Sequence, residues 1–233
     1  PSLNFFGKGV FRTISPRVAP RKEGVFYLLG GLFLLLGVVK TSFDRYFRNL
    51  FTVFFRASLK QKQMREQLLQ TPLASLLLNL FFVGVGGLFA SFVILERVKG
   101  AQYSFWILYG YSVAGLAILY LGKFFILKLL GWTLRMENTT DTYIFIVFLC
   151  NKVLAIFLLP LLLVAAFAHS NWATVAMTIA YVLVAGIFLY RYISSYGYIT
   201  REVKASRFHF FLYLCAFEVA PLLLIYKVLL KFV

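Results

Sequence analysis

The stretch TYIFIVFLCNKVLAIFLLPLLLVAAFA, from Thr142 to Ala168, decides the fold class. It carries a single charged residue, Lys152, and as a helix it is long enough to cross a hydrocarbon core of about 30 Å. Its apolar residues run on without the alternation typical of barrel strands. A helix also satisfies its backbone hydrogen bonds within the segment, as lipid requires. The stretch therefore predicts a transmembrane helix.

The rest of the chain repeats this pattern. Of its 233 residues, 61% are hydrophobic and only 14% are charged, whereas a soluble domain has about a quarter of its residues charged. The predicted spans are 24–39, 72–95, 103–122, 142–168, 172–190 and 208–226. We predict an all-α polytopic transmembrane bundle, a single membrane domain over 24–233 that follows a basic N-terminal tail at 1–23.

The distribution of Lys and Arg predicts the orientation. Of the 24 cationic residues, fourteen lie in the links after the first, third and fifth spans, which should therefore face the cytoplasm. Five more lie in the N-terminal tail, which six spans would place on the opposite side. If 24–39 were a re-entrant or interfacial segment, five spans would remain and the tail would be cytoplasmic. Both arrangements stay open.

The first link contains a predicted amphipathic helix at about 41–68. Its aromatic residues recur at helical spacing, and its arginines line the other face. The residues that define the two faces are Phe47, Phe51, Phe54, Arg45, Arg48 and Arg56. The helix can lie in the membrane plane with its arginines toward anionic lipid headgroups, or its basic face can dock on an acidic protein or on RNA. The net charge of +16 permits nucleic-acid contact without arguing for it, because cytoplasmic cations already have a topological explanation.

Two charged residues within the predicted spans, Lys152 and Glu218, are the main functional candidates. Each lies eleven residues after a charged residue that begins its span, so both should be about 16 Å deep. Asn151 adds a polar group at the same level. Three interpretations remain open: a buried ion pair that joins two helices, a proton or ion pathway, or no contact, with Lys152 reaching back toward the cytoplasmic interface.

Small residues predict close helix contacts. Gly84, Gly86 and Gly87 lie in the second span, and Gly110 and Ala114 lie in the third. Residues of this size let helix backbones approach one another in a membrane.

The remaining chemistry of the sequence is sparse. It contains no phosphate loop, dinucleotide-binding fingerprint, nucleophile elbow or HExxH motif. The two histidines, His169 and His209, fall at opposite membrane faces in the predicted topology, which disfavours a shared haem or metal. Cys150 and Cys215 are expected to be small buried apolar residues. We therefore expect no enzymatic activity, cofactor or metal site.

Four stretches carry a family resemblance: GVFY at 24–27, YFRNLF at 46–51, SLLLNLFF at 75–82 and FHFFLYLCAFEVAPLLL at 208–224. Together they resemble a family of Bacteroidota integral membrane proteins known as domain of unknown function 4271. The Cys, Glu and Pro of its last motif correspond to Cys215, Glu218 and Pro221. The resemblance implies a multi-pass protein of the bacterial cytoplasmic (inner) membrane, and it implies no activity.

These observations favour a non-enzymatic subunit or accessory factor of a larger membrane protein complex, in a setting such as protein export or envelope biogenesis. Its expected partners are the lipid bilayer, anionic headgroups and other membrane subunits. The alternative is a small transporter or proton-coupled channel that uses Lys152 and Glu218.

Overall fold

A computed structural model describes residues 23–55, 70–97, 104–133 and 137–202. These residues form six helices and no strand: α1 (Glu23–Ser42), α2 (Asp44–Phe55), α4 (Pro72–Arg97), α5 (Phe105–Thr133), α6 (Glu137–Phe167) and α7 (Ser170–Glu202). Five of them, all but α2, are long and apolar enough to cross a membrane. The all-α membrane fold is thus confirmed, and the first five predicted spans coincide with helices that could cross a membrane. The predicted sixth span, at 208–226, lies outside the described residues.

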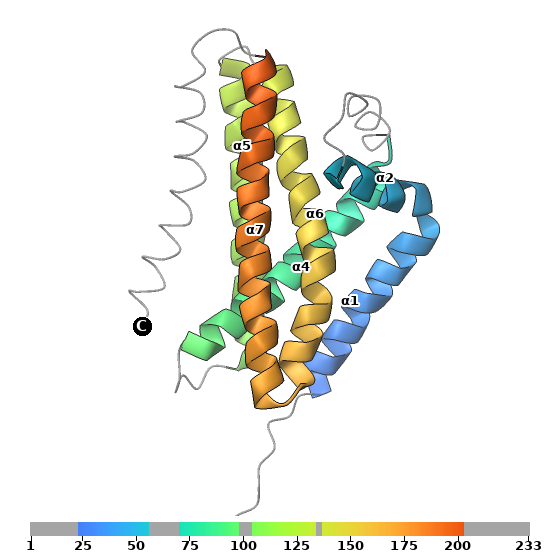
Figure 1. Ribbon diagram of the computed structural model, residues 1–233, viewed down its shortest axis with the longest axis vertical. Helices are drawn as coiled ribbons and strands as arrows, with labels where there is room; N and C mark the ends of the chain where they lie inside the picture. Colours follow the sequence, from blue (N-terminus) through green and yellow to red (C-terminus); the bar gives the residue numbers. More distant parts are fainter. Residues whose placement is uncertain (1–22, 56–69, 98–103, 134–136, 203–233) are drawn as a thin grey trace, which may run out of the picture.

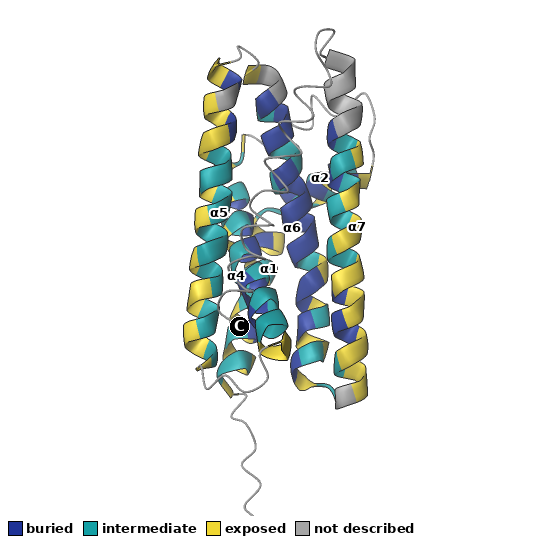
Figure 2. Cartoon of the chain, turned by 90° about the vertical axis from the view of Figure 1, so that its left-hand side faces the viewer, coloured by how far each residue is buried: buried dark blue, intermediate teal, exposed yellow. Residues whose placement is uncertain are grey.

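Helix α6 is the centre of the bundle. It contacts α7, α4, α5, α2 and α1. In its most apolar stretch 61% of the residues are buried, against 6% in the corresponding stretch of α5. Figure 2 shows the same contrast, with α6 mostly dark blue and the outer faces of α5 and α7 yellow. Helices with lipid on one side need no polar outer face, so the exposed apolar residues of α5 and α7 are those expected of a membrane bundle.

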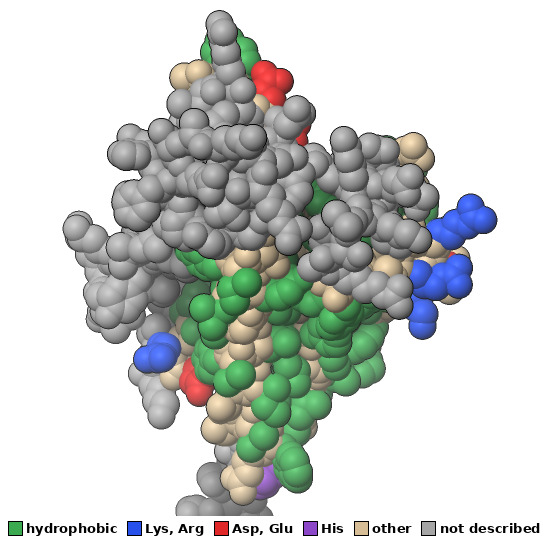
Figure 3. Space-filling model, turned by 45° about the horizontal axis from the view of Figure 1, so that its top comes forward, with side chains coloured by type: hydrophobic (Ala, Val, Ile, Leu, Met, Phe, Trp, Pro, Cys, Tyr) green, Lys and Arg blue, Asp and Glu red, His purple; other side chains and the backbone are tan. Residues whose placement is uncertain are grey.

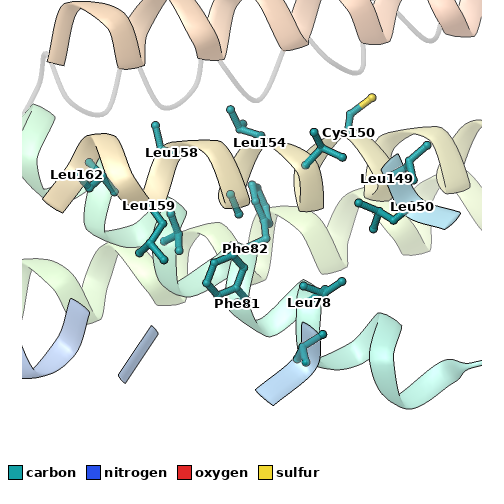
Figure 4. Packing of buried hydrophobic residues seen from close by; sticks show 14 of the residues in the cluster. Leu50, Leu78, Phe81, Phe82, Leu149, Cys150, Leu154, Leu158, Leu159 and Leu162 are labelled. Atoms are coloured by element: carbon teal, nitrogen blue, oxygen red, sulfur yellow. The ribbon is translucent and has the colours of Figure 1, made fainter. Parts of the chain in front are cut away.

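The core joins α6 to α4 and α2. Leu78 and Phe81 of α4 and Leu159 and Leu162 of α6 are fully buried, and Leu50 of α2 belongs to the same cluster. Figure 4 shows these side chains between the two long helices. Burial of side chains of this size fixes how α4 crosses α6, because the interior of a bundle tolerates few voids.

Glycines bring α4 close to α5. A Cβ added at Gly87 would lie 2.5 Å from Val113 Cγ2 and 3.2 Å from the Val113 backbone nitrogen. A Cβ added at Gly86 would lie 3.1 Å from Leu116 Cδ1 of α5, and one added at Gly84 would lie 3.1 Å from Leu32 Cδ2 of α1. The predicted contacts of these glycines are confirmed. The prediction for Gly110 is wrong in the described part of the chain, since a Cβ there would have open space within 4 Å.

Three helices are longer than the predicted spans. α5 runs through Phe124 to Thr133, α6 begins at Glu137 before the predicted start at Thr142, and α7 continues past Tyr190 to Glu202. Figure 1 shows all three continuing beyond α2, which lies beside α6 toward one end of the bundle. We call this end, where α2 lies, the α2 end; the predicted orientation makes it cytoplasmic.

Close contacts stabilise the extended ends of α5 and α6. Lys128 Nζ lies 2.7 Å from Asp141 Oδ1, and the Lys123 ammonium lies 5.5 Å from the centroid of the Tyr143 ring. A Cβ added at Gly131 would meet the Thr140 side chain at 2.8 Å. The two helices therefore remain packed together beyond the apolar part of the bundle.

Candidate functional site

The candidate site forms where Lys152 meets α2 and the first turn of α4. Lys152 is 4% exposed, and its ammonium donates hydrogen bonds to the Tyr46 hydroxyl at 2.9 Å and to the Ser75 hydroxyl at 2.7 Å. Nζ also lies 5.6 Å from the centroid of the Tyr46 ring. Lys152 forms no ion pair with a carboxylate in the described part of the chain. Its charge is therefore held by two hydroxyls and an aromatic ring rather than by a carboxylate.

The local sequence explains how these three side chains meet. Tyr46 belongs to the apolar face of α2 and is buried against the bundle. Phe43 lies between α1 and α2. Ser75 lies one turn into α4, after the helix has begun at Pro72, where a proline costs no backbone hydrogen bond. Because both residues belong to the α2 end, the Lys152 ammonium is directed toward that end.

Burial raises the pKa of the Tyr46 phenol above its usual value, and hydrogen bonding with Ser75 opposes this in part. The phenol is accordingly neutral at physiological pH, and its oxygen accepts a hydrogen bond from the Lys152 ammonium.

Several observations place Lys152 close to one membrane surface. α5 is free of charged residues from Phe105 to Gly122, and α7 is free of them from Ser170 to Tyr190, lengths of about 27 and about 31 Å. Tyr190, which ends the second stretch, donates a hydrogen bond to the carbonyl of Phe54 in α2. α2 therefore marks the level at which the charge-free stretches end.

The predicted depth of Lys152 assumed a span that starts at Asp141, whereas α6 starts earlier and passes α2 before it enters the apolar region. Each of the three interpretations of Lys152 stays a prediction, because its described contacts are with Tyr46 and Ser75. The other member of the predicted pair, Glu218, lies outside the described residues, so the pairing stays a prediction.

Asn151 also faces other helices. It is 3% exposed, and its Oδ1 accepts a hydrogen bond from the Tyr120 hydroxyl at 3.4 Å. Its Nδ2 has no partner among the described residues, and the same is true of the buried Oδ1 of Asn79 in α4. Polar atoms without partners are costly in a bundle core, so they mark a place where packing serves something besides stability.

A cavity of about 690 Å³ lies beside this polar cluster, between α4, α5 and α6. Figure 1 shows how α4 crosses α5 and α6 obliquely. Tyr46, Ser75, Asn79, Tyr120 and Lys152 line it together with the Lys128–Asp141 pair. The rest of its wall is apolar: Leu76, Leu80, Val83, Ala117, Leu121, Phe124, Ile144, Phe145, Phe148 and Leu149.

Sequence comparison identifies the family. Residues 25–229 match the family described as a domain of unknown function (DUF4271). The chain belongs to this family. No curated protein and no solved structure matches it. The resemblance seen in the sequence is thereby confirmed for the family, and this DUF4271 chain is a membrane protein with several apolar helices.

The structure describes the predicted docking helix over Asp44–Phe55, while the rest of the predicted segment, with Arg56, lies outside the described residues. Arg45 and Arg48 are exposed, Phe47 and Phe51 are half-buried, and Phe54 is buried. Its aromatic face is therefore partly covered by the DUF4271 bundle itself.

The sequence analysis missed Tyr46 and Ser75 as partners of Lys152. Two signals were present: Tyr46 is the tyrosine in a face built otherwise of phenylalanine and leucine, and Ser75 is a hydroxyl residue in the first turn of an apolar span. In the described part of the chain, no cluster of His, Cys, Asp and Glu could hold a metal ion.

Proposed function

We propose that this DUF4271 protein is a non-enzymatic subunit or accessory factor of a larger complex in the bacterial inner membrane, and that α2 is its docking element. The observation that supports the proposal is the way α2 is held. Its apolar residues are anchored in the bundle while its arginines face outward, so that it presents a fixed basic surface at the α2 end.

The anchoring of α2 is extensive for a helix of 12 residues. Leu50 and Val53 are at most 2% exposed. The Phe54 ring lies 4.6 Å from the Tyr190 ring, and the Phe51 ring packs edge-on to Phe157 at 6.1 Å between centroids. A helix that merely rested on lipid would not need contacts of this kind with α6 and α7.

The outward face of α2 is basic. Arg48 Nη2 lies 3.0 Å from Asp44 Oδ2, but the two side chains are 70% and 56% exposed, so the pair adds little to stability. Figure 3 shows Lys and Arg side chains projecting at one edge of the molecule, beyond the hydrophobic surface. Arginines held in this way can form paired hydrogen bonds with carboxylates, which makes an acidic surface of another membrane protein the fitting partner.

The cellular setting we propose is protein export or envelope biogenesis. This part rests on the resemblance to Bacteroidota membrane proteins and on the basic surface predicted to face the cytoplasm.

Purification in mild detergent from native membranes tests the proposal. We expect a partner protein at constant stoichiometry by mass spectrometry, and we expect the double variant Arg45→Gln, Arg48→Gln to lose it. The matched control is Arg97→Gln with Lys99→Gln, which removes the same charge from the link after the second span, predicted to face the opposite side in both arrangements. Retention of the partner by the α2 variant, or purification of the chain alone, would refute docking through α2.

The second candidate is a small transporter or proton-coupled channel that uses Lys152 and Glu218, favoured by the burial of Lys152 beside a cavity. Exchange of the two residues separates the roles. A structural pair should tolerate Lys152→Glu combined with Glu218→Lys better than either single change, whereas a proton path should fail in all three variants.

A further inference from the structure

We propose that the cavity between α4, α5 and α6 is a binding site for one anionic lipid, with the headgroup at Lys152 and an acyl chain between α4 and α5. This inference does not depend on the proposed docking role of α2.

The polar end of the cavity suits an anion. An ammonium group has three hydrogen-bond donors, and two of those on Lys152 are used by Tyr46 and Ser75. The third is left for a phosphate or carboxylate oxygen, because no carboxylate lies within ion-pair distance of Lys152 in the described chain. The hydroxyls of Tyr46 and Ser75 can donate to the same anion.

On the deep side of Lys152 the cavity wall is apolar, as the site of an acyl chain would be. Toward the α2 end the wall is mixed, with Phe124, Ile144, Phe145 and Phe148 before the Lys128–Asp141 pair. Lys152, Ser75 and Tyr46 belong to the α2 end, where the charge-free helical stretches begin. Val83 lies two turns further along α4, and Ala117 lies deeper in α5 than Leu121. A lipid of the leaflet at this surface has its headgroup and its tail in that order, whereas a soluble anion would leave the apolar part unfilled.

The cavity also opens where a lipid can enter. Leu76, Leu80 and Leu121 line it and are 62%, 59% and 58% exposed. In a membrane these leucines face acyl chains. An acyl chain can therefore move sideways from the bilayer into the cavity between α4 and α5 without crossing a polar barrier.

Lipid retention in native mass spectrometry tests the proposal. The full chain is reconstituted in nanodiscs that contain equal amounts of phosphatidylglycerol and phosphatidylcholine, and it is then released and weighed. We expect one phosphatidylglycerol per chain. Lys152→Gln should lower its retention at least about tenfold, since it removes a charge-assisted hydrogen bond. The control Lys40→Gln removes an equal charge at an exposed position near the same surface and should leave retention within about fivefold of the parent.

Two further variants keep the test decisive. Ala117→Phe fills the apolar part without touching Lys152, so it should also displace the lipid, even if Lys152→Gln fails to fold. Glu218→Gln tests occupation of the site by the chain itself, and we expect it to leave retention unchanged. Equal retention by the Lys152 and Lys40 variants, equal retention of the two lipids, or phosphatidylglycerol binding only after Glu218→Gln would overturn the proposal.

Discussion

Substitution of Gly87 by alanine probes the closest approach in the bundle. The new Cβ would lie 2.5 Å from Val113 Cγ2, 3.2 Å from its backbone nitrogen and 3.3 Å from its Cα. The methyl contact can be relieved by rotation of Val113, but the two backbone contacts can be relieved only if α4 and α5 move apart. The buried cluster that contains Phe81 packs α4 against α6, and this packing opposes the movement.

The expected magnitude follows from a comparison with Gly110→Ala. At Gly110 a Cβ would meet nothing within 4 Å, and both substitutions gain the same helix propensity. The difference between the two variants is therefore the overpacking cost, about 1–3 kcal/mol. For a chain of this length that corresponds to a melting temperature about 2–12 °C lower for Gly87→Ala than for Gly110→Ala.

Thermal unfolding in mild detergent, followed with a thiol-reactive dye, measures this difference. Cys150 is 1% exposed and should react only when the bundle opens, provided Cys215→Ala removes the other thiol. Adding Val113→Ala should recover part of the loss, since it removes the methyl but not the backbone. Equal melting temperatures for Gly87→Ala and Gly110→Ala would refute the close approach of α4 and α5.

Three other substitutions test separate parts of the bundle. Phe81→Ala empties a fully buried site and should cost about 3–5 kcal/mol in thermal or chemical unfolding, while Phe125→Ala, at a 68% exposed position, should change little. Lys128→Gln removes a half-exposed ion pair and should cost at most about 1 kcal/mol; a larger loss would mean that the helix extensions depend on it. Tyr46→Phe removes an acceptor of Lys152 and should cost about 1.5–3 kcal/mol. Because burial raises the pKa of Tyr46 above 10.0, ionisation of the phenol should change this cost only as pH rises through that range; a constant cost in unfolding measurements across alkaline pH would contradict it.

The helices could be predicted because their cause is local. An apolar run of about 20 residues has no other stable form in lipid, so the first five spans follow from composition alone. Their ends could not be predicted in this way. Beyond the apolar runs, α5 and α6 are joined by contacts such as Lys128 with Asp141 and Gly131 with Thr140, and pairings between two helices cannot be read from the composition of either one.

The candidate site shows the same limit. Lys152 was recognisable because a cation in an apolar run is rare and costly. Its partners were not, because Tyr46 and Ser75 are 106 and 77 residues away in the chain. The depth of Lys152 in the membrane, which was obtained by counting residues along a span, stays a prediction.

Two described hydrogen bonds explain how the Lys152 ammonium is tolerated in an apolar helix. Its insertion into an apolar helix costs about 2.5–3.5 kcal/mol, and the two hydrogen bonds that it donates contribute about 1.5–3 kcal/mol each. The two sides nearly balance, so the ammonium is tolerated but adds little to stability. An apolar residue of similar size would satisfy the fold as well, because buried charged clusters can often be replaced by hydrophobic residues without loss. Stability alone therefore gives no reason for a lysine at this position, whereas binding of an anion beside Tyr46 and Ser75 does.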